Sequence, residues 1–225
     1  MQIRPIGHIE SPYRQKFATP RQPGLVPAAR AVLRLDPKLE PEHALRGLEE
    51  FSHVWLIFWF HLNTNKLYHP VVHPPRLRGR TIGVFASRAP HRPNPIGLTA
   101  AKLEGVEKDG VLLSGVDLID GTPILDLKPY VPQYDALPHA HSGWIARKEF
   151  STLDVVFELD LEPELREVIA QTLSSDPRNP RDRAQLKEGK ILYFLLGDVD
   201  VCFSIRGRTA TVHSIERGSK RKPGR

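Results

Sequence analysis

Proline is the residue that most restricts how this chain can fold. The 225 residues include 21 prolines, and a proline cannot donate a hydrogen bond within the middle of a β-sheet. Many of the prolines border short apolar runs with strand-like composition, such as 28–35, 52–62 and the three runs within 98–130. Short strands joined by proline- and glycine-containing bends predict a closed, mostly antiparallel β-barrel or a β-sandwich.

Prolines are especially frequent in the segment 85–100, FASRAPHRPNPIGLTA. Three of its prolines lie within 90–95, between two strand-like runs, 80–87 and the run that begins at 98. Arg88 and Arg92 accompany these prolines. Because proline limits the backbone conformations available to the chain, we expect a loop held in one shape that presents its arginines.

The composition changes after Tyr130, which predicts a second structural unit. We expect a β-barrel domain over 1–148, a small α+β domain over 149–216 and a basic tail over 217–225. The remaining predicted elements are a helix over 40–51, a loop over 131–143, a strand over 151–160, a helix over 161–174, a charged loop over 175–190 and strands over 191–207 and 209–216. The apolar run 52–62 is typical of a strand buried on both faces.

The charge distribution indicates an anionic partner. The net charge is +6, and no Asp or Glu occurs between Glu50 and Glu104 or over 11–35. If these two basic segments converge on one face, that face would attract phosphate and nucleic acid. Alternatively, the charges are scattered over the solvated surface and have no common partner. The arginines that we expect to contact RNA are Arg76, Arg78, Arg80, Arg92 and Arg178.

Other familiar functional patterns are absent from the sequence. It has neither a dinucleotide fingerprint, a phosphate-binding P-loop nor an H-E-x-x-H pattern. We interpret His61, His69 and His73 as ordinary polar residues rather than metal ligands, and predict no metal site. The lone cysteine, Cys202, is interpreted as a packing residue. A single cysteine, no apolar leader and no long apolar segment predict a cytoplasmic protein without membrane attachment.

Three bends carry polar side chains, and together they predict a binding site. They are TPRQPGL (19–25), the proline-rich segment 85–100 and DLIDGTPILDLKPY (117–130). Each bend could be turn chemistry alone. If all three lie at one end of a barrel, their irregular backbone exposes amides and carbonyls that can bind a small molecule.

The same three motifs resemble the TsaA/TrmO family of S-adenosylmethionine-dependent tRNA adenine-N6 methyltransferases. The family pattern reads approximately P-R-Q-P-G, F-A-T-R-S-P-x-R-P-N-P-I-G and D-G-T-P-v-l-D-i-K-P-Y, against PRQPGL, FASRAPHRPNPIG and DGTPILDLKPY here. The resemblance implies a β-barrel methyltransferase with a small C-terminal domain and a homodimeric state. It also implies methyl transfer from S-adenosylmethionine to N6 of threonylcarbamoyladenosine, next to the anticodon of a tRNA.

The resemblance also implies which residues bind the methyl donor. These are Pro20, Arg21, Gln22, His61, Leu62, Arg88, Leu118, Ile119, Asp120 and Gly121. For catalysis we consider Asp120 or Asp126, or a backbone carbonyl beside them, as acceptor of the hydrogen bond from the adenine N6. Alternatively both aspartates only stabilise the turn. Lys128 is a further catalytic candidate without an assigned role.

The sequence departs from the family in one C-terminal motif. The family pattern D-P-R-P-x-Y appears here as DPRNPRDR (176–183), which keeps Asp176, Pro177 and Arg178. RNA choice could therefore differ. Tyr13, Phe17, Tyr130 and Tyr134 are candidates for stacking on bases, with core packing as the alternative. Two other functions remain open: a noncatalytic tRNA-binding barrel, and a methyltransferase of the same fold acting on a small molecule.

Overall fold

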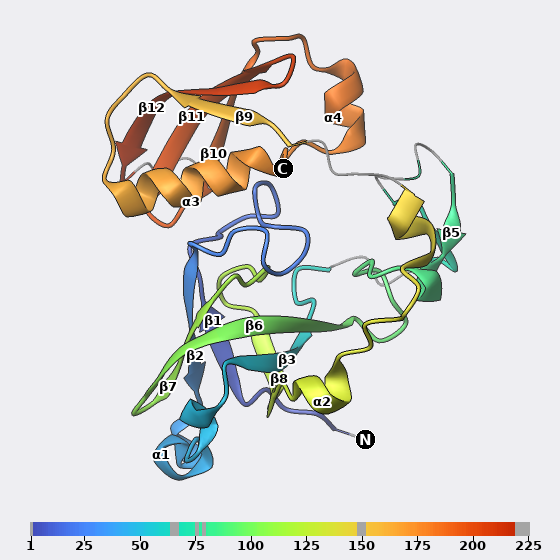
Figure 1. The fold of residues 1–225 in the computed structure, drawn as a ribbon, viewed down its shortest axis with the longest axis vertical. Coiled ribbons are helices and arrows are strands. Elements are labelled where there is room, and N and C mark those ends of the chain that lie inside the picture. The colour runs from blue at the N-terminus through green and yellow to red at the C-terminus, as the bar shows by residue number, and fades with distance from the viewer. Residues whose placement is uncertain (1, 64–67, 75–76, 78–79, 148–151, 219–225) are drawn as a thin grey trace.

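The computed structural model describes residues 2–63, 68–74, 77, 80–147 and 152–218. In the described residues the chain forms a closed β-barrel and a four-stranded sheet with helices, which Figure 1 shows one above the other. The predicted fold class, an antiparallel barrel followed by a small α+β region, is confirmed.

The barrel closes through antiparallel strands in the order β1-β2-β7-β6-β3-β8, with β8 pairing back onto β1. Their bounds are Gly7–Glu10 (β1), Arg30–Leu35 (β2), His53–Trp59 (β3), Ile96–Glu107 (β6), Gly110–Ser114 (β7) and Pro123–Pro129 (β8). The three strands predicted within 98–130 are thus confirmed.

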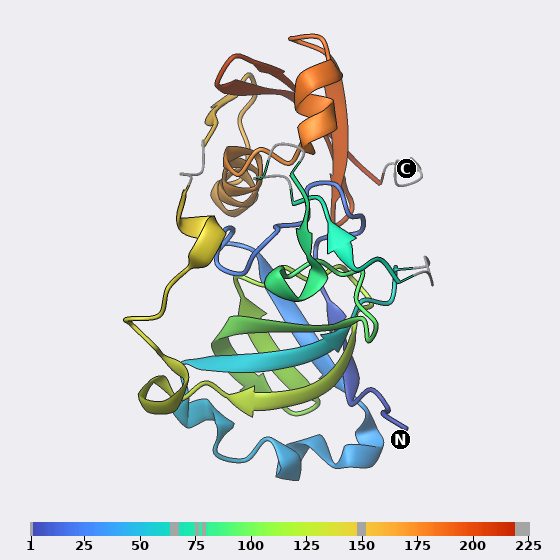
Figure 2. The ribbon, with the colours of Figure 1, turned by 90° about the vertical axis from the view of Figure 1, so that its right-hand side faces the viewer.

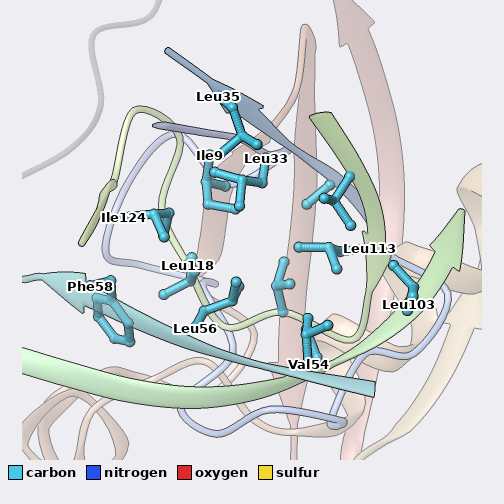
Figure 3. Close-up of a cluster of buried hydrophobic side chains, with 14 of the residues drawn as sticks. Ile9, Leu33, Leu35, Val54, Leu56, Phe58, Leu103, Leu113, Leu118 and Ile124 are labelled. Atoms are coloured by element: carbon cyan, nitrogen blue, oxygen red, sulfur yellow. The ribbon is translucent and has the colours of Figure 1, made fainter. Parts of the chain in front are cut away.

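Alternate residues of these strands point inward and form the barrel core (Figure 3). Ile9, Leu33, Leu56, Leu113 and Ile124 are all fully buried. Such alternation is the period-two pattern that places one side-chain set in the core and the other outside. It corrects the expectation that 52–62 is buried on both faces, since the burial of β3 alternates along the strand.

A short helical segment covers one end of the barrel and differs from the helix predicted over 40–51. The α-helix α1 spans only Pro41–Ala44, and a 3-10 helix follows at Leu48–Glu50. Leu45 caps the end of α1, and Gly47, with φ of 86° in the left-handed region, caps the start of the 3-10 helix. Leu45 and Leu48 still pack in the barrel core. The apolar pattern therefore predicted the buried residues correctly, whereas the predicted helix was too long.

The segment before β6 is less regular than the strand predicted over 80–87. Only Ile82–Gly83 (β5) forms a strand, paired with Val71–Val72 (β4), and a 3-10 helix follows at Val84–Ala86. The loop predicted over 131–143 contains the short helix α2 (Pro132–Asp135), and a 3-10 helix spans Gly143–Arg147, where the Trp144 indole donates a hydrogen bond to the Ala86 carbonyl at 2.9 Å.

The C-terminal region contains a sheet in the order β10-β11-β12-β9, where β9 runs parallel to β12. The strands are Asp154–Phe157 (β9), Ile191–Leu196 (β10), Val199–Arg206 (β11) and Thr209–Arg217 (β12). The predicted second helix is confirmed as α3 (Pro163–Ser174). The charged segment predicted as a loop contains the helix α4 (Pro180–Gln185), whose N-cap Asn179 accepts a hydrogen bond from the Asp182 amide.

The core of the C-terminal layer includes residues from the N-terminal part of the chain, which the predicted limits assign to the barrel domain. Tyr13, Ala18, Val26 and Ala29 belong to the core of the C-terminal layer, not to that of the barrel. In Figure 1 this early, blue part of the chain lies between the barrel and α3. The predicted boundary at 148–149 falls outside the described residues and stays a prediction, as does most of the basic tail. Cys202 is partly buried in β11.

Candidate functional site

A cavity of about 310 Å³ opens at the barrel end that faces the C-terminal layer. We call it the mouth cavity. It lies where β3 ends and β8 begins, and loops supply the rest of its wall. Its lining residues are Lys16, Thr19, Pro20, Arg21, Phe58, Trp59, Phe60, His61, Leu62, Asn63, Pro90, His91, Asp117, Leu118, Ile119 and Thr122. An apolar and aromatic wall with a few polar groups is typical of a small-molecule site.

The three sequence motifs converge at this cavity. Pro20 and Arg21 come from the first motif, Pro90 and His91 from the proline-rich segment, and Leu118 from the third. The predicted donor residues His61, Leu62 and Ile119 also line it. Contacts therefore join residues that are far apart in the sequence, as the barrel-end hypothesis requires.

Arg88 and Gln22 join the first two motifs next to the cavity. The Nη1 of Arg88 donates a hydrogen bond to Oε1 of Gln22 at 2.9 Å. Gln22 in turn donates from its side-chain amide to the carbonyl of Arg21. Neither Gln22 nor Arg88 belongs to the cavity lining, so their contact with the lining residue Arg21 is what relates them to the site.

The proline-rich loop is held by hydrogen bonds as well as by its prolines. Nη1 of Arg92 donates to the carbonyl oxygens of Val84 at 3.2 Å and Ser87 at 2.9 Å. The hydroxyl of Ser87 donates to the same Val84 carbonyl at 2.8 Å. The guanidinium of Arg92 also lies over the ring of Phe85. Arg92, predicted to contact RNA, thus braces its own loop in this structure.

Asp117 is the carboxylate at the cavity that the sequence-based site assignment missed. Among the described lining residues it is the one acidic side chain. Its Oδ1 accepts a hydrogen bond from the Thr99 hydroxyl at 2.7 Å. Burial raises the pKa of Asp117, while the Thr99 hydrogen bond and the Arg88 charge act in the opposite direction. The sequence marked Asp117 only as one of several aspartates in a bend.

His61 brings an imidazole to the same cavity. Burial lowers its pKa, and the nearby charges of His8 and Lys16 lower it further. The neutral imidazole is therefore favoured at neutral pH, because protonation would add a partly buried positive charge beside other cations.

The structure places the predicted catalytic residues away from the cavity lining. Asp120 accepts a hydrogen bond from the Ser11 amide at 3.0 Å and lies 3.9 Å from Arg14, in a separate shallow groove beside β1. The neighbouring Gly121 also lies outside the lining. These contacts attach the turn of Asp120 to the segment that follows β1, and its expected roles in catalysis and donor binding stay predictions.

Asp126 and Lys128 lie on the outer face of the barrel. They pair in β8 with Ile57 and Trp55, whose side chains point outward, and their own charged groups are 2.9 Å apart. Neither lines the mouth cavity. Of the three aspartates, Asp117 is the one that lines the mouth cavity, and the catalytic roles expected of Asp126 and Lys128 stay predictions.

The arginines predicted to bind RNA differ in their surroundings, and their role stays a prediction. Arg80 is exposed, whereas the Nε of Arg178 pairs with Asp176 at 2.9 Å. Arg76 and Arg78 lie outside the described residues. Of the stacking candidates, Tyr13 is buried in the C-terminal core and Phe17 packs against it, while Tyr130 contacts Trp55 and Tyr134 is largely exposed.

Neither a metal-binding cluster nor a membrane-spanning helix is found among the described residues. No group of three or more His, Cys, Asp or Glu side chains there is arranged to bind a metal ion. Within the same residues, no helix has the length and apolar character required to cross a membrane.

The fold and site define a closed β-barrel protein with a ligand-sized cavity at one barrel end. Residues 8–136 match the model of the tRNA-methyltransferase O N-terminal domain. The chain therefore belongs to this family.

Individual relatives extend the match. The chain is 39% identical over 230 residues to the tRNA (adenine(37)-N6)-methyltransferase of Escherichia coli K12, covering 96% of this chain and 97% of that protein. It is 56% identical over 134 residues to the mouse protein of the same name, covering 59% of this chain but 31% of the mouse protein. Relatives from Pseudomonas aeruginosa and Pyrococcus abyssi are named for S-adenosylmethionine.

A solved structure supports the fold over both layers. The crystal structure of TrmO from Pseudomonas aeruginosa superposes with a TM-score of 0.80 at 38% identity. The superposition covers 96% of this chain and 98% of that one. The similarity thus includes the C-terminal layer, beyond the matched family domain.

Proposed function

We propose that this protein is an S-adenosylmethionine-dependent tRNA (adenine(37)-N6)-methyltransferase acting on N6 of threonylcarbamoyladenosine next to the anticodon. The observation that carries the proposal is the convergence of Arg21, His61 and Asp117 on the mouth cavity. Its support is the match to the Escherichia coli protein of that name along nearly the whole of both chains.

The mouth cavity fits the chemistry of the proposed donor. S-adenosylmethionine carries a carboxylate, an ammonium, a sulfonium and an adenine. The guanidinium of Arg21 suits the carboxylate. Asp117 suits the positively charged part, because a cation next to a buried carboxylate offsets its desolvation. Trp59 and Phe60 give an aromatic surface for an adenine ring.

The bound donor supplies an activated methyl group on sulfur, so the task left to this chain is to orient and shield the reactants. The adenine N6 is a weak nucleophile, since its lone pair is delocalised into the ring. Holding it close to the methyl carbon and excluding water are therefore the contributions expected of the cavity wall. The neutral state of His61 favours this arrangement, because a protonated imidazole would repel a sulfonium.

Transfer RNA is the proposed macromolecular partner, through the anticodon stem-loop. The acid-free stretch 51–103 and exposed groups such as Arg80 and Tyr134 provide charge and an aromatic ring for a single-stranded loop. A flipped base could then enter the mouth cavity while phosphates stay outside. We include a cytoplasmic location in the proposal, because the proposed substrate is a tRNA.

A homodimer is the proposed assembly, as the family resemblance implies. The outer face of β3 and β6 is unusually apolar for a solvated surface: Trp59 is 39% exposed and Leu98 is 57% exposed. Ile57 lies opposite Leu98 in the strand register, which makes the apolar surface continuous. The Leu98→Glu variant should shift the dimer to a monomer in sedimentation velocity. An unchanged sedimentation coefficient at equal concentration would place the contact elsewhere.

The test of the proposed function is methyl incorporation from labelled S-adenosylmethionine into two tRNA pools. One pool carries threonylcarbamoyladenosine and the other is prepared without it. We expect label only in the modified pool, mapped to N6 of that base. A companion variant is Arg88→Ala, which removes the contact to Gln22 and should lower donor affinity without a large change in melting temperature.

The two alternatives give different results in the same experiment. A noncatalytic tRNA-binding barrel would bind both pools without saturable donor binding in calorimetry. A methyltransferase for a small molecule would bind the donor but label neither pool. Label in both pools would show that the threonylcarbamoyl group is not recognised, and would contradict the proposed substrate.

A further inference from the structure

The loop that carries Arg21 to the mouth cavity is attached to the C-terminal layer. On either side of it, Tyr13 and Val26 are buried among side chains of α3 and of the sheet strands. Backbone contacts reinforce this attachment: the Gly197 amide donates to the Pro12 carbonyl at 2.6 Å. The Gln171 side chain of α3 accepts from the Ala28 amide at 2.9 Å. The position of the loop therefore depends on a layer outside the barrel.

Asp176 organises the part of this layer that faces Arg21. It is 4% exposed and has φ of 48°, in the left-handed region. Its carboxylate accepts two hydrogen bonds from Arg178, at 2.9 and 3.0 Å, and pairs with Nε of Arg183 at 3.1 Å. A carboxylate buried to this degree needs such partners. Because Arg183 also donates to the carbonyl oxygens of residues 176 and 178, at 3.0 and 3.2 Å, the backbone of 176–178 is fixed.

Two carbonyl groups of this fixed backbone hold Arg21. Its Nη2 donates to the carbonyl oxygen of Pro177 at 3.1 Å and to that of Arg178 at 2.7 Å. Arg21 at the same time lines the mouth cavity. A guanidinium has five N–H donors, so the groups on Nη1 and Nε are left for a ligand. The two carbonyls thereby set the direction in which those donors point.

We propose that Asp176 and Arg183 are positioning residues that orient Arg21 toward the carboxylate of the methyl donor. The inference rests on the proposed function, and it makes the C-terminal layer part of the donor site. The guanidinium groups of Arg178 and Arg183 contact the carboxylate of Asp176, and that of Arg21 binds the adjacent carbonyl groups, so three arginines share this one buried carboxylate nearby. The cluster therefore keeps an excess of positive charge, which favours an anion at Arg21.

The test is a double-mutant cycle on donor affinity, measured by calorimetry with S-adenosylmethionine alone. Asp176→Asn keeps a residue type that tolerates a left-handed backbone but removes the charge that holds the two arginines. We expect it to weaken donor binding about tenfold. In an Arg21→Ala background the same substitution should change the dissociation constant less than about twofold, because the group that it positions is absent. At saturating donor, kcat with modified tRNA should stay within about twofold of the wild type.

A second variant covers the case in which Asp176→Asn does not fold. Arg183→Gln lies at the surface side of the cluster, where the arginine side chain is 37% exposed, and should weaken donor binding about threefold, again only when Arg21 is present. The matched control is Glu158→Gln, which breaks a carboxylate–His213 contact of 2.7 Å in the same layer. It should leave the donor dissociation constant unchanged.

Equal weakening in both backgrounds, or unchanged affinity in folded Asp176→Asn and Arg183→Gln proteins, would overturn the positioning role. These outcomes are separable from failure of the proposed function. If wild-type protein binds the donor but labels no tRNA, the proposed methyl acceptor is contradicted. The double-mutant cycle still decides the positioning role, because it measures donor affinity alone. Wild-type protein without donor affinity would contradict both proposals.

Discussion

The two ends of the barrel are built for different purposes. At the end beneath α1, apolar side chains such as Leu45 and Leu48 extend the barrel core and close it. At the opposite end, the loops hold Arg21, His61 and Asp117 around a cavity, and a second layer of structure lies above it. Figure 2 shows the helical segment at one end and the C-terminal layer at the other. The closed end thus adds apolar side chains to the barrel core, whereas the open end presents groups that can bind a ligand.

The difference also explains why the open end needs a second layer. Loops that expose charged groups to a ligand bury little apolar surface of their own, so they gain little from the hydrophobic effect. Here Tyr13 and Val26 anchor the first loop in another core, and Arg92 braces the proline-rich loop from within. Because each loop is held by contacts outside the barrel core, no polar group is needed inside that core to hold them.

The largest expected effect is on stability at the closed end. Leu48 is 8% exposed and packs against the barrel core, so Leu48→Ala should lower the free energy of unfolding by about 2–4 kcal/mol. Urea unfolding measures this change. Calorimetry at a temperature where the variant is folded should give an unchanged donor dissociation constant. A large loss of donor affinity in folded variant would show that the two ends are coupled.

A smaller effect, on binding, is expected at the open end. Asp117→Asn removes the charge that we assign to the positive part of the donor, and should weaken donor binding about tenfold with little change in melting temperature. The matched control is Asp126→Asn, which removes a carboxylate from the outer face of the same barrel. Calorimetry on both variants decides the assignment, since equal weakening would point to a general loss of negative charge.

The same pair of variants predicts a dependence on pH. Burial raises the pKa of Asp117, so its carboxylate is charged above that raised value and neutral below it. Affinity for a cationic donor should therefore be full above the pKa and fall as the pH decreases through it. Asp117→Asn should remove this dependence. We assign any pH dependence that remains in this variant to His61. Its pKa is lowered, and its protonation at low pH would also weaken binding of a cationic donor.

The sequence predicted the barrel well because its information is local and repeated. Alternating apolar residues in 98–114 specify strands and their inner face, and the observed register follows that alternation. The helix over 40–51 was predicted too long, because α1 ends at Ala44 and Gly47 then adopts a left-handed conformation, neither of which the apolar pattern reveals. The motifs also predicted correctly that distant loops meet at one barrel end.

The site itself was only partly predictable. Pro20, Arg21 and His61 carry recognisable motifs and do line the mouth cavity. Asp117, Asp120 and Asp126 look alike in the sequence, since all three lie in one bend-rich stretch. Only the barrel closure decides which carboxylate points to the cavity, and that depends on residues in other strands such as Thr99. The contact between Arg21 and residues 177–178 is likewise invisible to local patterns.

The smallest expected effect tests that distinction between similar residues. Lys128 and Asp126 form an ion pair 2.9 Å apart, with 62% and 44% of their side chains exposed. Water and salt screen such a pair, so Lys128→Gln should change the free energy of unfolding by at most about 0.5 kcal/mol. Because neither group lines the mouth cavity, kcat with modified tRNA should stay within about twofold of the wild type. A kcat reduced more than about tenfold with unchanged stability would instead restore Lys128 as a catalytic residue. The active centre would then extend over the outer face of β8, and the open end would no longer be the sole place of chemistry.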